Sequence, residues 1–320
     1  MKFKGIIKLF LVILISGVSL NSISQTLNEA GDAFNKGIEA TKAGNFEQAI
    51  QSHQKAMEIA EQLGAEGDDL KLKAMQQIAK QYLNAGIADY KAKDYNGAIK
   101  NFQQASELAA KVNDLDTQLK AENYLSVFYS SYGMSNWKKD EFGKAMDYFN
   151  KSLAIDPSNT KSMLGVALVY KSQGKESEMK KAIDKLILTG PADDKYVSQG
   201  TEVAYKYYLA EGAKKMQGKA YAEAIELFNT SMEYNDPEES TYYYLAVAYN
   251  ASSNWDKALE AAEKGLKIAD KNKANLYFEK ARALEGKGDT AAACDTYKMV
   301  TDGPNLASAK YKIETELKCN

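Results

Sequence analysis

The sequence predicts an all-α protein built from stacked helix pairs, and three observations lead to this fold class. A short pattern returns seven times along the chain: an aromatic residue, a small residue three positions later, and usually a bulky residue four positions after that. Apolar residues within each copy recur three and four positions apart, as on a helix face, and no strand-like alternation persists. Only four prolines occur in 320 residues, which suits long helices. Such self-similarity indicates a repeat array in which each unit buries its apolar face against its neighbours.

Five copies of the pattern are clear, and two weaker copies centre on Met179 and Ala293. The clear copies are Phe46, Ala49 and His53; Tyr95, Ala98 and Phe102; Phe142, Ala145 and Phe149; Tyr221, Ala224 and Phe228; and Trp255, Ala258 and Ala262. Turns such as residues 42–45 and 217–219 separate the two helices of a pair, because Gly there can adopt the left-handed conformation that ends a helix. The small residue is expected where the two helices approach most closely. A Gly or Ala twelve residues earlier is expected at the matching contact on the first helix.

The spacing of the copies predicts helices of two lengths. The small residues lie 49 and 47 residues apart between Ala49 and Ala145, but 34 apart between Ala145 and Met179. The surplus of about 14 residues corresponds to roughly two additional turns on each of two helices. We therefore expect long helices in the front half and ordinary ones in the back half. The weak fourth copy, around Met179, is expected to be the most loosely packed.

The domain organisation follows from one turn. The interval from Met179 to Ala224 is 45 residues and contains residues 189–194, Thr-Gly-Pro-Ala-Asp-Asp. Gly and Pro interrupt helices, so this turn is the expected hinge. It would separate an N-terminal array, residues 25–190, from a C-terminal array, residues 195–304.

The N-terminus has the layout of a secretory signal peptide, expected to span residues 1–24. Three lysines precede an apolar run, Leu9 to Leu20, and small residues follow at Ser22 and Ser24. An uncleaved membrane anchor is the alternative, but this run is shorter than the roughly 20 apolar residues that span a bilayer. We expect an exported protein, in the periplasm or at the cell surface of a Gram-negative bacterium, without membrane insertion after cleavage.

The C-terminus predicts a cap on the array, residues 305–320. Leu306 to Leu317 is an amphipathic stretch without a partner helix, and a repeat array needs such a covering element at its end. The only two cysteines are Cys294 and Cys319. In an exported protein this pair suggests a disulfide that would join the cap to the last repeat. Two unbonded thiols are the alternative.

Charge and motifs argue against several functions. The net charge is −2 and Arg282 is the only arginine, so nothing favours nucleic acid as a partner. The only histidine, His53, occupies an interior position that is Phe in sister copies, which favours a structural role. The sequence holds no metal-ligand spacing, phosphate-binding Gly loop or nucleophile elbow. We therefore expect no enzyme activity, no metal and no cofactor.

The repeated pattern resembles the tetratricopeptide repeat. That repeat pairs a small residue on its first helix with an Ala, an aromatic residue and a late Pro on its second. The best copy is Tyr129, Tyr132, Gly133, Phe142, Ala145, Phe149 and Pro157. The resemblance extends over residues 30 to 304. It implies a right-handed superhelix, or α-solenoid, of about seven helix pairs that binds other proteins rather than performing chemistry.

The resemblance also implies where a protein or peptide partner would bind. In this family, first-helix residues fifteen and eleven positions before the small Ala line a concave groove, and here these positions are largely apolar. The Lys and Asn pairs with which some members grip acidic peptide termini are missing. The expected contact residues are Phe34, Ile38, Leu83, Ile87, Tyr90, Met134 and Trp137. Neighbouring helices covering this strip are one alternative. A small-ligand or glycan receptor, using Tyr205 and Tyr243 near the hinge, is another.

Overall fold

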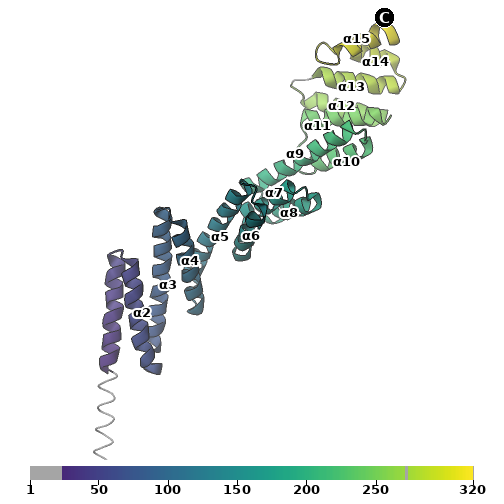
Figure 1. The fold of residues 1–320 in the computed structure, drawn as a ribbon. Coiled ribbons are helices and arrows are strands. Elements are labelled where there is room, and N and C mark those ends of the chain that lie inside the picture. The colour runs from purple at the N-terminus through teal and green to yellow at the C-terminus, as the bar shows by residue number, and fades with distance from the viewer. Residues whose placement is uncertain (1–23, 271–272, 320) are drawn as a thin grey trace, which may run out of the picture. The chain divides into compact units, whose positions relative to one another are not determined.

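The computed structural model describes residues 24–270 and 273–319, and these residues are almost entirely helical (Figure 1). All but one residue of the expected signal peptide lies outside the described residues. Within the described ranges, every helix falls short of the combined length and apolarity that crossing a bilayer takes.

The chain contacts divide the protein into two compact units, Met1–Val169 and Tyr170–Asn320. This division comes before the turn at residues 189–194, the expected hinge, which joins two contacting helices inside the second unit. In the first unit, one helix spans residues 24–42 and is followed by α2 (Phe46–Gln62), α3 (Asp68–Lys91), α4 (Tyr95–Lys111), α5 (Leu115–Trp137) and α6 (Phe142–Ile155). Helix α7 (Thr160–Ser172) contains the division.

The second unit continues with the same kind of succession. Its helices are α8 (Glu176–Thr189), α9 (Lys195–Gln217), α10 (Tyr221–Met232), α11 (Glu239–Ala251), α12 (Trp255–Ile268), α13 (Lys273–Gly286), α14 (Thr290–Tyr297) and α15 (Leu306–Tyr311). One turn of π-helix, Lys312–Glu316, extends α15.

From α2 to α6 in the first unit, and from α8 to α14 in the second, consecutive helices pack against each other as antiparallel neighbours (Figure 1). Alternate helices touch as well: α3 contacts α5, α9 contacts α11, and α11 contacts α13. This is the packing of stacked helix pairs, so the all-α class and the repeat organisation are confirmed. The right-handed superhelical course stays a prediction.

Helix lengths confirm one expectation and correct another. Helices α3 and α5 have 24 and 23 residues, whereas α6, α7 and α8 have 14, 13 and 14. The surplus lies mostly on the first helix of a pair, since α2 and α4 have only 17 residues each. The back half also contains a long helix, α9 with 23 residues. The 45-residue interval therefore reflects this helix more than the turn before it.

Side-chain caps and left-handed residues explain where the helices begin and end. The carboxylates of Asp94, Asp114 and Asp289 accept hydrogen bonds from backbone N–H groups in the first turns of α4, α5 and α14. Gly44 has φ 75° in the turn before α2, as expected of Gly. In the turn before α10, however, Lys219 takes the left-handed conformation with φ 59°.

The bulky residue of each copy fills the space between helices. Phe102, Phe149 and Phe228 are fully buried, and so is His53. In the four pairs with a glycine on the first helix, this glycine faces the bulky ring rather than the small Ala: a methyl group added at Gly133 would lie 2.5 Å from Phe149. The fourth copy is not loosely packed, because Met179 and Ile183 are fully buried too.

We predict that Gly133→Ala destabilises the first unit. Overpacking typically costs about 1–3 kcal/mol, and the gain of about 1 kcal/mol in helix propensity offsets only part of it. Urea denaturation followed by circular dichroism would measure the loss. Gly143→Ala is the matched control, because nothing lies within 4 Å of the added methyl group; this variant should be as stable as the parent or more so.

Candidate functional site

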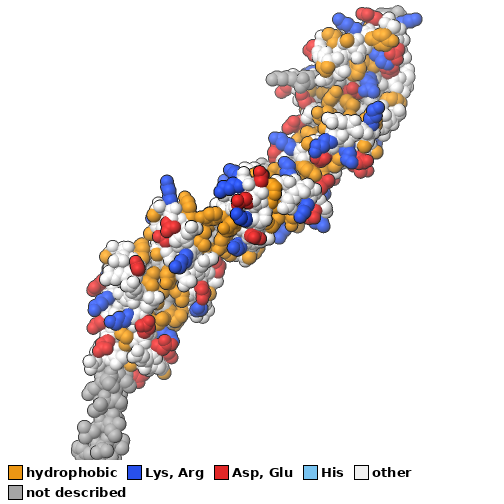
Figure 2. All heavy atoms as spheres, in the orientation of Figure 1, with side chains coloured by type: hydrophobic (Ala, Val, Ile, Leu, Met, Phe, Trp, Pro, Cys, Tyr) orange, Lys and Arg blue, Asp and Glu red, His pale blue; other side chains and the backbone are white. Residues whose placement is uncertain are grey.

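A pocket of about 550 Å³ opens on the first unit, where the end of α3 and the start of α4 meet the length of α5. Its volume lies within the range of about 300–1,000 Å³ usual for ligand pockets. Nine residues line it: Tyr90, Tyr95, Asn123, Tyr124, Val127, Phe128, Ser131, Tyr132 and Ser135. None of them is charged, and five are aromatic. Figure 2 shows apolar side chains reaching the surface of this unit around α4 and α5. We call the pocket the aromatic groove.

Helix α5 forms the floor of the aromatic groove with two rows of residues at a spacing of four. One row is Tyr124, Phe128 and Tyr132; the other is Asn123, Val127, Ser131 and Ser135. Residues four apart lie on one side of a helix, one turn above the other, about 6 Å apart along its axis. The second row is exposed, and Val127 has 52% of its surface accessible. The floor is therefore an elongated strip rather than a round cavity.

Two tyrosines on either side of the α3–α4 turn form a wall of the aromatic groove. The Tyr90 and Tyr95 rings lie 5.3 and 5.9 Å from the Phe128 ring, centre to centre, and both remain exposed at 47% and 41%. Phe128 itself is buried, and its ring lies 6.0 Å from the core ring of Phe102. Phe102 also stacks on Tyr124 at 4.6 Å. The wall and floor of the aromatic groove thus pack on the core of the repeat.

Four tyrosine hydroxyls around the aromatic groove are free to bind another molecule. Among the described residues, none forms a hydrogen bond with the hydroxyls of the four lining tyrosines, Tyr90, Tyr95, Tyr124 and Tyr132. By contrast, the neighbouring Tyr129 hydroxyl, which does not line the groove, accepts a hydrogen bond from Gln103 Nε2 at 2.9 Å. Burial, and then the nearby Tyr148, Tyr95 and Asp94, raise the pKa of Tyr132. Tyr132 therefore stays protonated at neutral pH, and its hydroxyl can donate a hydrogen bond.

The charges at the edge of the aromatic groove have opposite signs. Lys161 Nζ donates to Ser131 Oγ at 3.0 Å, whereas the carboxylate of Asp94 contributes to the raised pKa of Tyr132. Asp94 is already engaged as the N-cap of α4, where it accepts from the Gly97 N–H at 3.0 Å. The groove thus attracts neither strongly acidic nor strongly basic groups.

The expected contact strip coincides with the aromatic groove at one residue, Tyr90. Leu83 is only 8% exposed and packs in the core with Ala98 and Phe102, so it is not a groove residue. Ile87 is half-buried against the same core. Leu83 and Ile87 therefore pack in the core and do not form an exposed binding face.

The other residues of the expected strip lie outside the aromatic groove. Met134 and Trp137 are half-buried and pack around Phe149. Phe34 lies edge-on to the His53 ring at 4.9 Å, and Ile38 is half-buried on the same first helix. Counting positions back from the small Ala missed the row on α5. The aromatic residues at 124, 128 and 132, spaced by four, were the signal that could have found it.

The alternative receptor site in the second unit is not available as proposed. Tyr205 is 1% exposed, and its hydroxyl lies 2.6 Å from the Thr241 hydroxyl and accepts from the Glu238 N–H at 2.9 Å. Tyr243 lies on α11, where its ring meets that of Tyr244 at 5.6 Å. Tyr205 is therefore a core residue with its hydrogen bonds made, and it offers a ligand no surface.

His53 is a core residue whose ring nitrogens have no hydrogen-bond partner in the described structure. Its side chain is fully buried between Phe34 and Gly37. Burial lowers the pKa of the imidazole, so the neutral form fills this space. In residues 24–270 and 273–319, no cluster of three or more His, Cys, Asp or Glu side chains is arranged to hold a metal ion.

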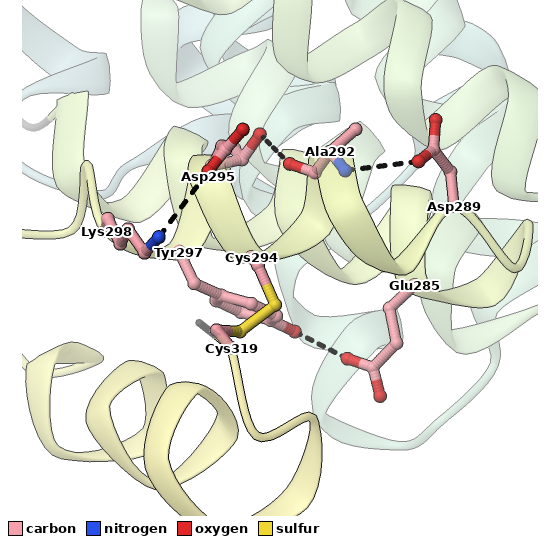
Figure 3. The surroundings of a disulfide bond; sticks show 9 residues. Glu285, Asp289, Ala292, Cys294, Asp295, Tyr297, Lys298 and Cys319 are labelled. Carbon is pink, nitrogen blue, oxygen red and sulfur yellow. Dashed lines mark hydrogen bonds and ion pairs between the residues drawn. A yellow bond between two sulfur atoms is a disulfide. The ribbon is translucent and has the colours of Figure 1, made fainter.

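A disulfide bond joins Cys294 to Cys319 at the C-terminal end, with Cα atoms 5.6 Å apart (Figure 3). Ala309 and the half-buried Ile313 and Leu317 pack on a cluster that includes Tyr297. The Tyr297 hydroxyl donates to Glu285 at 2.8 Å, and Glu285 also pairs with Lys312 at 2.6 Å. Burial and the Glu285 carboxylate raise the pKa of Tyr297. These contacts show that the last segment covers the end of the stack.

Comparison with known proteins identifies the repeat. The sequence model of the tetratricopeptide repeat matches residues 128–159, which lie in the second half of α5, in α6 and in the turn after it. The helix pairs described above repeat this unit along the chain. Residues 128–159 thus form a tetratricopeptide repeat, and proteins built from this repeat typically provide scaffolds for protein–protein interaction and are usually non-enzymatic.

Two relatives and one solved structure are similar to this chain. Superkiller protein 3 of Schizosaccharomyces pombe is 25% identical over 164 residues, covering 49% of this chain and 11% of that protein. The TPR repeat-containing protein MJ1428 of Methanocaldococcus jannaschii is 27% identical over 190 residues, covering 55% and 28%. The chain therefore spans less than a third of either relative. The solved TPR2AB domain of yeast Sti1, in a complex with pHSP90, is 18% identical, covers 91% of this chain and 97% of that one, and has a TM-score of 0.33.

We predict that the stability of the first unit falls at acidic pH because of His53. As the pH drops below 6.5, the ordinary imidazole pKa, His53 binds a proton in the unfolded chain but stays neutral in the folded protein. The free energy of unfolding falls by at most about 1.4 kcal/mol per pH unit, until the pH is below the lowered pKa of His53 in the folded protein. Urea midpoints of the parent and of His53→Phe, at pH 7.5 and 5.5, measure it. An unchanged pH difference in His53→Phe would refute the assignment, since no other histidine exists.

We predict that removing the disulfide destabilises the cap and the last repeat. A closed loop with a sequence separation of 25 residues is worth about 3 kcal/mol in the chain-entropy model. The Cys294→Ser/Cys319→Ser variant should therefore lose amide hydrogen-exchange protection in α14 and residues 306–317. Helices α2 to α5 serve as the internal control, because repeats contact only their neighbours. Equal protection in variant and parent would contradict the prediction.

Proposed function

We propose that this protein is a non-enzymatic scaffold or assembly factor that holds a segment of a protein partner in the aromatic groove. The observation that supports this most is the uncharged strip along α5, walled by the exposed rings of Tyr90 and Tyr95. Tyrosines of this kind dominate binding energy at protein interfaces, because they combine apolar area with a hydroxyl group. The strip is elongated and open, which suits a chain segment better than a compact small molecule.

We further propose that it works in the cell envelope, in the periplasm or at the cell surface of a Gram-negative bacterium. The expected signal peptide at residues 1–24 supports export. The Cys294–Cys319 disulfide supports it independently, because such bonds persist in oxidising compartments and are rare in the cytosol. Fractionation of cells producing the tagged protein, with and without residues 1–24, tests the setting. Retention of the full-length protein in the cytoplasm would contradict it.

We predict that a photo-crosslinking amino acid at Val127 captures a discrete partner from the host's own envelope, and that the adduct maps to the aromatic groove. Val127 is exposed on the floor, so a bound segment would touch it. Adding Tyr90→Ala and Tyr95→Ala should lower the yield at least about tenfold, since such anchors typically contribute 1 kcal/mol or more each.

The matched control carries the crosslinker at Lys120, which is exposed on the same helix but outside the aromatic groove. Equal adduct yields from Lys120 and Val127 would contradict binding in the aromatic groove. So would an adduct yield at Val127 that stays the same when the two alanine substitutions are added. Circular dichroism of each variant checks that the helices remain formed.

A further inference from the structure

Resting on the proposed function of the aromatic groove, we propose that its occupant is a proline-rich segment in the polyproline II conformation. The groove combines three properties that together favour this chemistry over other peptide conformations. Its lining is uncharged, it is rich in aromatic rings, and its tyrosine hydroxyls have no hydrogen-bond partner among the described residues. Aromatic-lined grooves of this composition are a recurring way to bind polyproline II segments.

The charge of the lining excludes strongly charged occupants. None of the nine lining residues carries a charge, and the two charged groups at its edge, Lys161 and Asp94, have opposite signs. A charged side chain buried against the five rings would lose its hydration without gaining a counter-ion. The complementary segment is therefore uncharged and largely apolar.

The hydrogen-bonding groups of the aromatic groove match a backbone that accepts but does not donate. The hydroxyls of Tyr90, Tyr95, Tyr124 and Tyr132 can each donate one bond, and the Asn123 side-chain amide can donate two. A polyproline II segment makes no internal hydrogen bonds, so its carbonyl groups are free to accept. Proline has no N–H, so such a segment brings no donor that would need an acceptor.

Other conformations fit these groups less well. A bound helix satisfies its own backbone, so the four tyrosine hydroxyls would lose water without gaining partners, which costs free energy. A bound β-strand brings one N–H per residue, but the helices around the groove already use their carbonyl groups internally. A proline-rich segment avoids both costs.

The spacing of the floor is compatible with this occupant. Tyr124 and Tyr132 lie about 12 Å apart along the axis of α5. A polyproline II helix has three residues per turn and rises about 3.1 Å per residue, so the residues on one of its faces recur about every 9.3 Å. Two successive residues of one face therefore fit along the floor.

Fluorescence anisotropy with three labelled, uncharged dodecapeptides tests the proposal on the purified protein. The first peptide is proline with leucine at every fourth position. The second replaces each proline by serine, which removes the polyproline II preference. The third is an amphipathic helix of alanine, leucine and glutamine. We expect saturable binding of the proline peptide, at least about tenfold tighter than that of the other two.

Groove variants locate the binding and test the hydroxyl argument. Val127→Lys should abolish binding of the proline peptide, because it places a charge on the floor. Tyr90→Phe and Tyr95→Phe keep the rings and remove only the hydroxyls, and each should weaken binding about fivefold, the effect of one ordinary hydrogen bond. Tyr311→Phe is the matched control, since Tyr311 is an exposed tyrosine of the second unit, and it should change nothing.

The outcomes separate this proposal from the proposed function. Tighter binding of the serine or helical peptide, lost in Val127→Lys, would overturn the proline assignment and leave the aromatic groove as a partner site. Unchanged binding in both Tyr→Phe variants would also overturn it. If none of the three peptides binds, the proline-rich occupant is wrong, and crosslinking at Val127 decides separately whether the groove holds a partner.

Discussion

The contact on which the rest of the structure depends is a buried ring packed against a glycine on the neighbouring helix. Phe102 against Gly86, Phe149 against Gly133, and Phe228 against Gly212 repeat this contact along the chain. The ring fills the space between two helices, and only a residue without a side chain lets the first helix approach closely enough. Because interiors are packed as densely as crystals, the contact leaves little freedom in how the two helices pair. Each helix pair thereby becomes a unit that stacks on the next.

The aromatic groove is a consequence of this packing. Phe102 fills the space between the two helices of its own pair. Its ring also contacts Tyr124 and Phe128 of the next long helix, α5. The Phe128 ring in turn contacts the exposed rings of Tyr90 and Tyr95. The aromatic groove and the core are therefore built from adjoining residues, and the tyrosine hydroxyls of the groove take no part in the core.

Much of the fold could be predicted from the sequence, but little of the candidate site. The turns at residues 42–45 and 217–219 were predicted from composition, and a helix ends at each of them. The surplus length was assigned equally to two helices, whereas it lies mainly on α3 and α5. Leu83 was assigned to a groove although it is buried, because counting from a motif gives a helix face but not the depth at which a neighbouring helix covers it.

The sequence by itself determined the helical class, the pairing of helices and the interior position of the recurring ring. These follow from local periodicity and from steric limits on neighbouring residues, which act over short distances along the chain. Only the tertiary structure decided which apolar residues stay exposed and how the rings of Tyr90 and Tyr95 pack on Phe128. It also decided which tyrosine hydroxyls have no hydrogen-bond partner among the described residues. Those properties depend on the angle and distance between packed helices. They are set by many side chains at once, so no single motif encodes them.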